Sequence, residues 1–301
     1  MQTAEQIIQA LEDAGFRAAF LPVSAMEQVR EHYDTLLERG PDTQWLRNAV
    51  KHFHDNQPPE LDFEPRSILV TAAPYAGGKL ALHRRGDVVE IPIPPNCLSQ
   101  LPGRRLGDIL SAIAEGRQIG QTRGVSAKLL AVLSGLGQYG RNNLCYVGEW
   151  GSYADPSGFY TDIPYEGPIQ TDLRMAACEN CDLCRRACPT GAIGGTQVID
   201  ASHCLSSVNN GRKGSMPRWV PKDAHHTLVE CLRCQECCPQ NPPVDYSHVL
   251  ALDEDETKRL LSHRKKMPKD IEKKFREFGL NWSMAALKRN ARLAVKTNDR
   301  T

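Results

Sequence analysis

The sequence predicts an α+β protein with a mixed helix and strand N-terminal domain, a cysteine-rich segment and a helical tail. Helical and strand-like apolar patterns alternate up to about residue 165. Cysteine and proline cluster from about 170 to 245, where little regular structure is expected, and apolar residues return at helical spacing after 249. We therefore expect three parts, at residues 1–165, 166–248 and 249–301.

The first elements already mix helix and strand. Apolar residues at helical spacing over 3–14 predict a helix with Thr3 as its N-cap. Residues 17–23 predict a strand, and Ser24 is the expected N-cap of a helix that runs to about Glu38.

The following elements continue this mixture. Residues 66–73 are an apolar run that predicts a buried strand, and 87–93 predict another. Helices are expected over 104–115 and 126–134, and a short strand over 144–147. The order favours an α+β or α/β domain.

Seven of the eleven cysteines form two ferredoxin-type runs, and an eighth stands between the runs. The first run is C-x₂-C-x₂-C-x₃-C-P, from Cys178 to Pro189, and the second is C-x₂-C-x₃-C-P, from Cys231 to Pro239. Cys204 stands between them. Such runs hold [4Fe–4S] clusters, and the last cysteine of a run usually binds the other run's cluster. The chain is therefore expected to transfer single electrons.

Three closely spaced cysteines on one loop reach three corners of a cubane, so the fourth ligand must come from elsewhere. We expect cluster one to be bound by Cys178, Cys181, Cys184 and Cys238, and cluster two by Cys188, Cys204, Cys231 and Cys234. The alternative places Cys237 in a C-x₂-C-x₂-C run in place of Cys238.

Other interpretations of the cysteines are zinc and disulfides. Structural zinc prefers paired C-x₂-C knuckles separated by a longer loop, and disulfides need an oxidising compartment. Cys97 and Cys145 lie outside both runs and are expected to be small buried apolar residues. His225 and His226 either face a cluster or begin a helix that leads to Cys231.

The charges are distributed unevenly along a chain whose net charge is only +1. Residues 256–301 hold 14 Lys and Arg against 5 Asp and Glu, a net charge of +9, so the preceding residues carry −8. No apolar stretch approaches the ~18 residues that span a bilayer. The N-terminus does not resemble a secretory signal. We expect a cytoplasmic protein without a membrane partner.

Residues from about 120 to 245 resemble the epoxyqueuosine reductase family, which is related to reductive dehalogenases. Residues 134–143, SGLGQYGRNN, are similar to the family segment AGLGWIGKNT. Cys204 follows an I-D-A step that is a family feature. Residues 230–241 resemble the family's GCDxCQxVCPWN, in which Cys237 falls on an apolar position.

The resemblance implies a nitroreductase-like, cobalamin-binding N-terminal domain, a bacterial-ferredoxin-like double-cluster domain and a short helical tail. It implies that two clusters pass electrons to cobalamin, and that the epoxide of a modified base in a tRNA anticodon loop is reduced to an alkene. The implied partners are a low-potential electron donor of the flavodoxin or ferredoxin type and tRNA, which the basic tail would contact. On the cobalamin side, the resemblance implies Gly135, Gly137, Tyr139, Arg141 and Asn142.

The proton donor departs from the family pattern. Gln121 stands where the family places an acid, and glutamine does not give up a proton at neutral pH. Tyr75, at a strand end, is the first candidate to replace it, although such a tyrosine also fits a packing role. Tyr139, His83 and Asp108 are further candidates.

Three functions follow from these observations. The chain is a cobalamin-dependent reductase of a nucleoside in RNA, a similar reductase of a small metabolite, as in dehalogenation, or a two-cluster electron carrier or corrinoid activator. Gln121 favours the last two functions, and the GLGQYGRN segment favours the first two.

Overall fold

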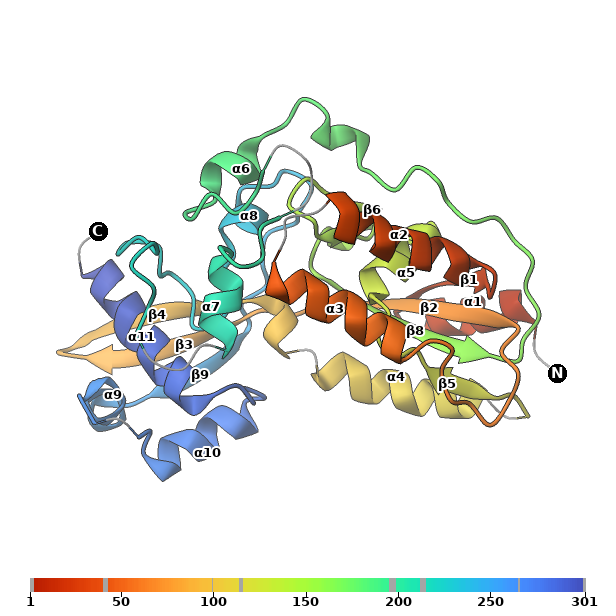
Figure 1. Ribbon diagram of the computed structural model, residues 1–301. Coiled ribbons are helices and arrows are strands. Elements are labelled where there is room, and N and C mark those ends of the chain that lie inside the picture. Colours follow the sequence, from red (N-terminus) through yellow and green to blue (C-terminus); the bar gives the residue numbers. More distant parts are fainter. Residues whose placement is uncertain are drawn as a thin grey trace. The chain divides into compact units, whose positions relative to one another are not determined.

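A computed structural model describes residues 3–39, 43–98, 100–113, 116–194, 199–211, 215–264 and 266–299. The chain forms two compact units, each built from separated stretches of sequence (Figure 1). Unit 1 comprises residues 1–74, 101–182 and 195–200, and unit 2 comprises residues 75–100, 183–194 and 201–301. Each of these units combines separated stretches, whereas the parts predicted from the sequence are consecutive. The predicted boundaries at 165 and 248 stay predictions.

Unit 1 is built on a four-stranded antiparallel sheet with the order β1-β2-β8-β5. Its strands are β1 (Arg17–Pro22), β2 (Ser67–Pro74), β8 (Ala154–Thr161) and β5 (Ile119–Gln121). Strand β2 is buried over almost its whole length, as the apolar run predicts. The mixture of helices with an antiparallel sheet confirms an α+β architecture for this part of the chain.

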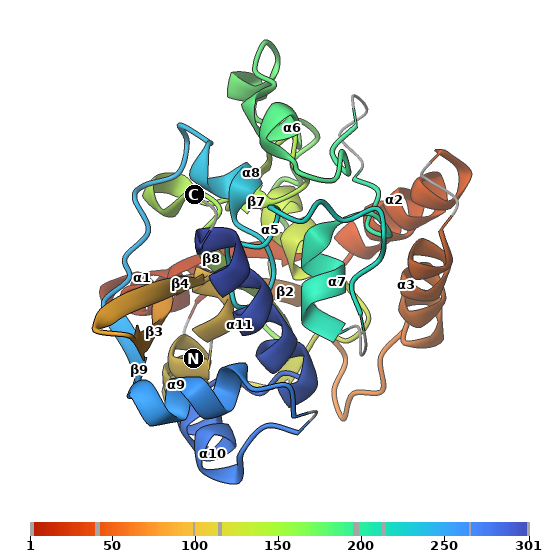
Figure 2. The ribbon, with the colours of Figure 1, turned by 90° about the vertical axis from the view of Figure 1, so that its left-hand side faces the viewer.

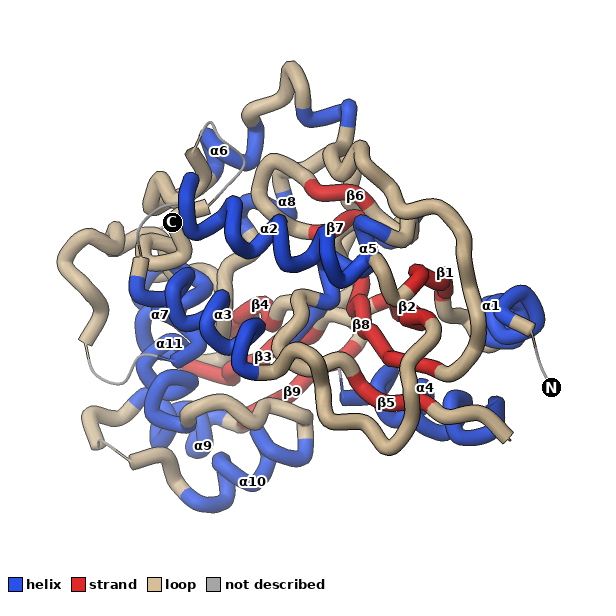
Figure 3. The backbone as a smooth tube through the Cα atoms, turned by 45° about the vertical axis from the view of Figure 1, so that its right-hand side comes forward, coloured by secondary structure: helices blue, strands red, loops and turns tan. Residues whose placement is uncertain are grey.

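Helices cover both faces of the unit 1 sheet, and α3 and α4 lie on opposite sides of it in Figure 3. One core packs α1 (Ala4–Asp13) and α4 (Gln100–Ile113) on Leu69 of β2. The other packs α2 (Ala25–Arg39), α3 (Gln44–Asp55) and α5 (Ala127–Leu133) on its neighbours Ile68 and Val70. Side chains alternate between the faces of a strand, so one strand supplies both cores.

The sequence predicts most of these elements but misses α3, β5 and β8. Strand β8 has the sequence ADPSGFYT, whose Asp, Pro, Ser and Gly are typical of turns rather than of a central strand. Gly158 is required by packing, because a Cβ there would lie 2.5 Å from Cδ1 of Leu130 on α5. Close packing of α5 therefore requires glycine at 158, and glycine is uncommon in strands, so the sequence does not predict β8.

Unit 2 is built on a three-stranded sheet with the order β4-β3-β9. Strand β3 (Gly78–Arg84) pairs antiparallel with β4 (Asp87–Ile93) and parallel with β9 (His248–Leu252). The short helices α6 (Leu183–Ala187), α7 (Leu205–Gly211) and α8 (Arg233–Glu236) belong to the cysteine-rich segment. Their shortness agrees with the expectation of little regular structure there.

The C-terminal residues form a large part of the core of unit 2. Helices α9 (Glu254–Leu261), α10 (Lys269–Glu277) and α11 (Met284–Asn298) surround the β4-β3-β9 sheet (Figure 2). Fully buried side chains from all three helices, including Leu260, Phe275 and Leu287, pack with Leu80 and Leu82 of β3. The residues predicted as a basic tail are thus integral to this unit. None of the described helices is long and apolar enough to cross a membrane.

Replacement of Phe275 by alanine tests this packing. Phe275 is 0% exposed, so Phe275→Ala should lower the free energy of unfolding by about 3–5 kcal/mol. Lys273→Ala, which removes an exposed side chain of the same helix, should have little effect. Urea denaturation of the purified chains measures both values, and equal stability of the two variants would contradict the assignment of α10 to the core.

Candidate functional site

The four cysteines predicted to bind cluster two all lie in unit 2, on separate loops. Cys188 follows α6, Cys204 precedes α7, and Cys231 and Cys234 lie at the start of α8. The thiol of Cys234 interacts electrostatically with the other three, Cys188, Cys204 and Cys231, and also with Cys184, which is predicted to bind cluster one. Three separated segments of sequence therefore bring these four sulfur atoms into one neighbourhood.

Burial makes three of these thiols, those of Cys204, Cys231 and Cys234, poor acids in the absence of metal. It raises the pKa of Cys231 to about 12 and raises the pKa of Cys204 and Cys234. Backbone N–H groups oppose this shift, because Ser206 and Ser207 donate toward Cys204 and Arg233 donates toward Cys231. Buried sulfur atoms that repel one another when charged, surrounded by hydrogen-bond donors, suit a cationic metal centre that takes them as thiolates.

In the described ranges, no three His, Cys, Asp or Glu side chains converge on a single metal ion. The thiolates of a cubane bind different iron atoms, so they stand farther apart than the ligands of one ion.

The loop before Cys231 is held by side chains of α7. Glu230 has a positive φ of 49°, which a residue other than glycine seldom adopts. Its N–H donates to Oδ1 of Asn210 at 2.9 Å, and its carbonyl accepts from Nδ2 of Asn209 and from the Thr227 hydroxyl. The side chains thus supply the hydrogen bonds that a regular element would supply to its own backbone.

Two residues of α11 fasten the same region from the C-terminal side. Asn290 is fully buried, and its Nδ2 donates to the carbonyls of Leu228 at 2.9 Å and Asn209 at 3.0 Å. Arg289 donates to Oδ1 of Asn290 and to the carbonyl of Val208. The C-terminal helix thereby connects α7 to the loop that leads to Cys231.

His226 also supports the loop that leads to Cys231. From the sequence, it is expected either to face a cluster or to begin a helix. Its Nε2 lies 3.3 Å from the N–H of Leu232 and its Nδ1 lies 3.1 Å from the carbonyl of Ala224. Burial lowers its pKa to about 4, so the ring is neutral, with Nδ1 as donor and Nε2 as acceptor. No helix begins at His225 and His226, because residues 218–232 form turns.

Cys178 and Cys181 of predicted cluster one lie in unit 1, on a loop that Arg141 contacts closely. The backbone N–H of Arg141 donates to Sγ of Cys178 at 3.4 Å. Its guanidinium donates to the carbonyls of Cys178, Glu179 and Cys181, with 2.7 Å from Nε to Cys181. Cys184 and Cys238 belong to unit 2.

The residues predicted on the cobalamin side make contacts within the chain. A Cβ on Gly137 would lie 2.6 Å from Sγ of Cys145, and one on Gly135 would lie 3.3 Å from the side chain of Gln170. Asn142 is buried and donates to the Tyr146 hydroxyl at 3.0 Å.

Tyr139 is mostly buried and hydrogen-bonds Ser126, and burial raises its pKa. Whether it and the other four residues bind cobalamin stays a prediction.

The candidates for the proton donor lie on both units. Gln121 ends the edge strand β5 and is exposed, and Asp108 is exposed on α4. Tyr75 follows β2 and is half-buried, and two residues later Gly77 donates to the carbonyl of Asp245. His83 is exposed on β3. The proposed role of Tyr75 as donor stays a prediction.

The cysteines outside the two runs are buried, as the sequence predicts. Cys97 is 2% exposed and Cys145 is 4% exposed, and burial raises the pKa of Cys145 to about 12. Cys237 ends α8, and its backbone N–H donates to Gln235. Its position does not decide between Cys237 and Cys238 as ligand.

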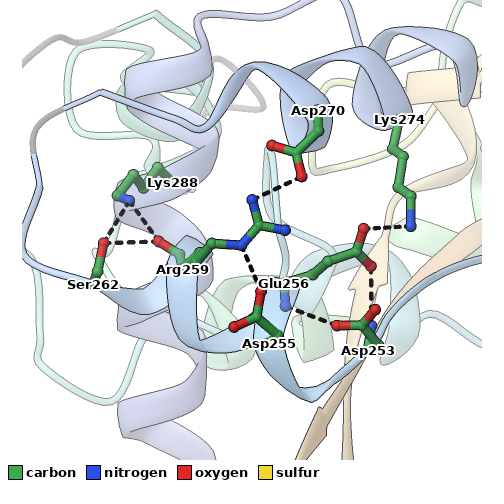
Figure 4. Close-up of polar contacts among 8 residues, drawn as sticks. All are labelled: Asp253, Asp255, Glu256, Arg259, Ser262, Asp270, Lys274 and Lys288. Carbon is green, nitrogen blue, oxygen red and sulfur yellow. Dashed lines mark hydrogen bonds and ion pairs between the residues drawn. The ribbon is translucent and has the colours of Figure 1, made fainter.

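Much of the basic charge of the tail is paired within unit 2. Figure 4 shows Lys274 of α10 pointing toward the buried Glu256 of α9, with Nζ and Oε1 2.5 Å apart. Arg259 forms ion pairs with Asp255 at 2.9 Å and Asp270 at 2.7 Å. These ion pairs join α9 to α10, and their acids Glu256 and Asp270 are already counted in the net charge of +9. Further basic residues of this region are exposed: Lys258, Arg264, Lys266, Lys269 and Lys296.

Known proteins provide the remaining comparison. A family described as a 4Fe-4S double cluster binding domain matches residues 177–241, the segment that holds all eight predicted ligands. Epoxyqueuosine reductase of Gloeobacter violaceus is 33% identical over 119 residues, which are 39% of this chain and 36% of that protein. The enzyme of Bacillus subtilis is 30% identical over 122 residues, which are 40% and 31% of the two chains. Over these stretches the chain is similar to epoxyqueuosine reductases.

The double-cluster match supports two [4Fe–4S] clusters in this epoxyqueuosine reductase-like chain, as the sequence predicts. Its matches span about a third of the length of these curated relatives. The structure of epoxyqueuosine reductase from Streptococcus thermophilus superposes with a TM-score of 0.67 at 20% identity, over 99% of this chain and 82% of that one. An epoxyqueuosine reductase bound to a modified tRNA stem loop superposes with a TM-score of 0.66, over 97% and 80%. The fold is therefore that of epoxyqueuosine reductases.

Asn290→Ala tests the support that α11 gives to the cluster-two loop. It leaves two buried carbonyls without their donor, which should lower the free energy of unfolding by about 1–3 kcal/mol. It should also lower the iron retained per chain after reconstitution. Lys296→Ala, on an exposed part of the same helix, is the control. Urea denaturation and iron analysis decide the outcome, and an Asn290→Ala protein that matches the control in both would contradict this support.

Proposed function

We propose that the chain is an iron–sulfur reductase that passes single electrons through two [4Fe–4S] clusters to a substrate of the kind that epoxyqueuosine reductases reduce. One observation carries the proposal: cysteine thiols from three separated segments interact with one another inside a matched double-cluster domain. A second support is the fold, which extends over nearly the whole chain and not only over the cluster domain. An electron carrier would not need the two-faced sheet of unit 1.

The proposed ligands of cluster two are Cys188, Cys204, Cys231 and Cys234, because their thiols interact with one another in unit 2. The Thr190 hydroxyl lies 3.7 Å from Sγ of Cys188 and adds a donor at a fourth sulfur atom. The proposed ligands of cluster one, Cys178, Cys181, Cys184 and Cys238, rest on spacing and on the family resemblance. When bound, the two clusters supply electrons one at a time.

The chain's own residues exclude water and hold hydrogen-bond donors at the sulfur atoms. Removal of an epoxide oxygen as water takes two electrons and two protons and leaves an alkene. Gln121 cannot supply a proton, so the donor is a different group or solvent. We propose Tyr75 for this role because it follows a central strand of unit 1 and is only half-buried. A phenol with an ordinary pKa near 10 remains protonated at neutral pH.

Cobalamin as the electron acceptor is proposed on the family resemblance alone, as are the nitroreductase-like class of the N-terminal fold and cytoplasmic residence. The cobalamin-binding role of the five residues that the resemblance assigns stays a prediction, and each of them makes contacts within the chain. Gly135 and Gly137 pack closely against Gln170 and Cys145. Tyr139 and Asn142 form hydrogen bonds with Ser126 and Tyr146. The Arg141 guanidinium donates to three backbone carbonyls. The assignment of the cysteine ligands does not rest on the cobalamin-binding role of these residues.

We propose tRNA as the substrate and a low-potential flavodoxin or ferredoxin as the electron donor. A structural neighbour was solved with an epoxyqueuosine-modified tRNA stem loop, which supports the first partner. Exposed Lys258, Arg264, Lys266 and Lys269 offer charge for phosphate contacts.

Cysteine variants test the ligand assignment. The wild type, reconstituted anaerobically with iron and sulfide, should hold about eight irons per chain, as two [4Fe–4S] clusters require. Cys204→Ala should retain about half of this iron, because cluster two loses a ligand. Cys238→Ala should also lose iron, whereas Cys237→Ala should keep it. Loss of iron from Cys237→Ala with retention by Cys238→Ala would reverse the assignment of that ligand.

The reaction is tested with a tRNA stem loop that carries epoxyqueuosine, a chemical reductant and the reconstituted chain, with and without added cobalamin. We expect mass spectrometry of the nucleosides to detect loss of one oxygen atom only when the reconstituted chain and cobalamin are both present. Gln121→Asp should accelerate this loss by about 10²-fold or more, the usual contribution of a general acid.

Two results would revise the proposal. Turnover without cobalamin would remove the corrinoid. A protein with about eight irons, in which neither the wild type nor Gln121→Asp acts on RNA, would leave the electron carrier or a reductase of a small metabolite.

A further inference from the structure

The segment GLGQYGRNN supplies no cluster ligand, yet hydrogen bonds and strand pairing fix its conformation. Strand β6 (Gln138–Tyr139) pairs antiparallel with β7 (Cys145–Tyr146), and residues 140–144 form the tip between them. The N–H of Gly140 donates to the carbonyl of Leu144 at 2.9 Å, and Asn143 takes a positive φ of 60°. These contacts define a hairpin of unit 1 with a tight tip.

Hydrogen bonds and close packing hold the tip of the hairpin in place. Lys128 of α5 donates from Nζ to the carbonyl of Asn143 at 3.0 Å. Asn142 donates to the Tyr146 hydroxyl and accepts from the N–H of Leu144 at 3.3 Å. Gly140 permits this closeness, since a Cβ there would lie 2.5 Å from Cε2 of Tyr146. The residues before and after Arg141 thus fix the position of its backbone.

The same hairpin holds the chain that enters the first cysteine run. The N–H of Tyr139 donates to the carbonyl of Leu173 at 2.7 Å, and the N–H of Met175 donates to the carbonyl of Tyr139 at 3.0 Å. Three residues after Met175 comes Cys178. The cysteine loop therefore leaves directly from a segment paired with β6.

Arg141 then holds the loop itself. Its guanidinium donates to the carbonyls of Cys178, Glu179 and Cys181, and its backbone N–H donates to Sγ of Cys178. The planar guanidinium has several donors in a fixed fork, which an ammonium group lacks. Hydrogen bonds to cluster sulfur atoms and nearby charge set the reduction potential of an iron–sulfur cluster.

We propose that Arg141 is a positioning residue of cluster one: it fastens the Cys178–Cys181 loop to the tip of the β6–β7 hairpin and raises the reduction potential of that cluster. The inference rests on the cluster ligands of the proposed function but not on the substrate or on cobalamin. The N–H donor and the positive charge both favour the reduced, more negative state of the cluster. The guanidinium fixes the conformation of the loop because it donates to three of the loop's carbonyls.

Substitutions separate the clamp from the charge. Arg141→Lys keeps the charge and the backbone N–H but loses the fork, whereas Arg141→Gln loses the charge as well. Arg174→Ala, which removes an exposed arginine side chain of the same unit, is the matched control. All are compared as full chains reconstituted anaerobically.

The readouts are iron loss to a chelator and a redox titration followed by electron paramagnetic resonance. Both Arg141 variants should lose about half of their iron at least about tenfold faster than the control, the change expected for one to two lost hydrogen bonds. Arg141→Gln should also lower the midpoint potential of one cluster and leave the other unchanged. Arg141→Lys should keep that potential closer to the wild-type value.

Unchanged iron release and potentials in Arg141→Gln would overturn the proposal. Equal changes in both clusters would also overturn it, because they would indicate general unfolding. Urea denaturation of the same samples detects such unfolding directly. A wild type that binds no iron would instead overturn the proposed function, so the two failures are distinguishable.

Discussion

The backbone hydrogen bonds of the cysteine loops are the constraint on which the rest of this structure depends. Ligand spacing that suits a cluster forces the chain into short turns, in which many N–H and carbonyl groups have no partner in a helix or sheet. Glu230, with its positive φ directly before Cys231, is the clearest case. A conformation of this kind persists only when neighbouring residues over-determine it.

The two units meet this constraint in different ways. In unit 2, amide side chains from α7 and α11 bind the backbone of Glu230 and of Leu228, and the neutral ring of His226 binds the N–H of Leu232. In unit 1, one arginine at the tip of a hairpin binds three carbonyls of the loop that carries Cys178 and Cys181. Both solutions place side-chain donors, supported by a packed core, on loops that cannot support themselves.

This need also explains the use of charge and of the C-terminal residues. Cations such as Lys274 and Arg259 are paired with acids that join α9 to α10. These helices build the core on which α11 lies, and α11 presents Asn290 to the loop before Cys231. The basic C-terminal residues therefore contribute to the metal centre through packing, whatever they contribute to a partner.

The sequence by itself determined the number of clusters, the cysteines available to them and most helices of unit 1, because ligand spacing and apolar periodicity are local. It also predicted that Cys97 and Cys145 are buried. Only the tertiary structure decided the place of β8, whose Gly158 reflects packing against α5. It alone also placed the C-terminal helices in the core of unit 2 and turned Arg141 toward the cysteine loop. These features depend on contacts between residues far apart in the chain, for which a single sequence carries no periodic signal.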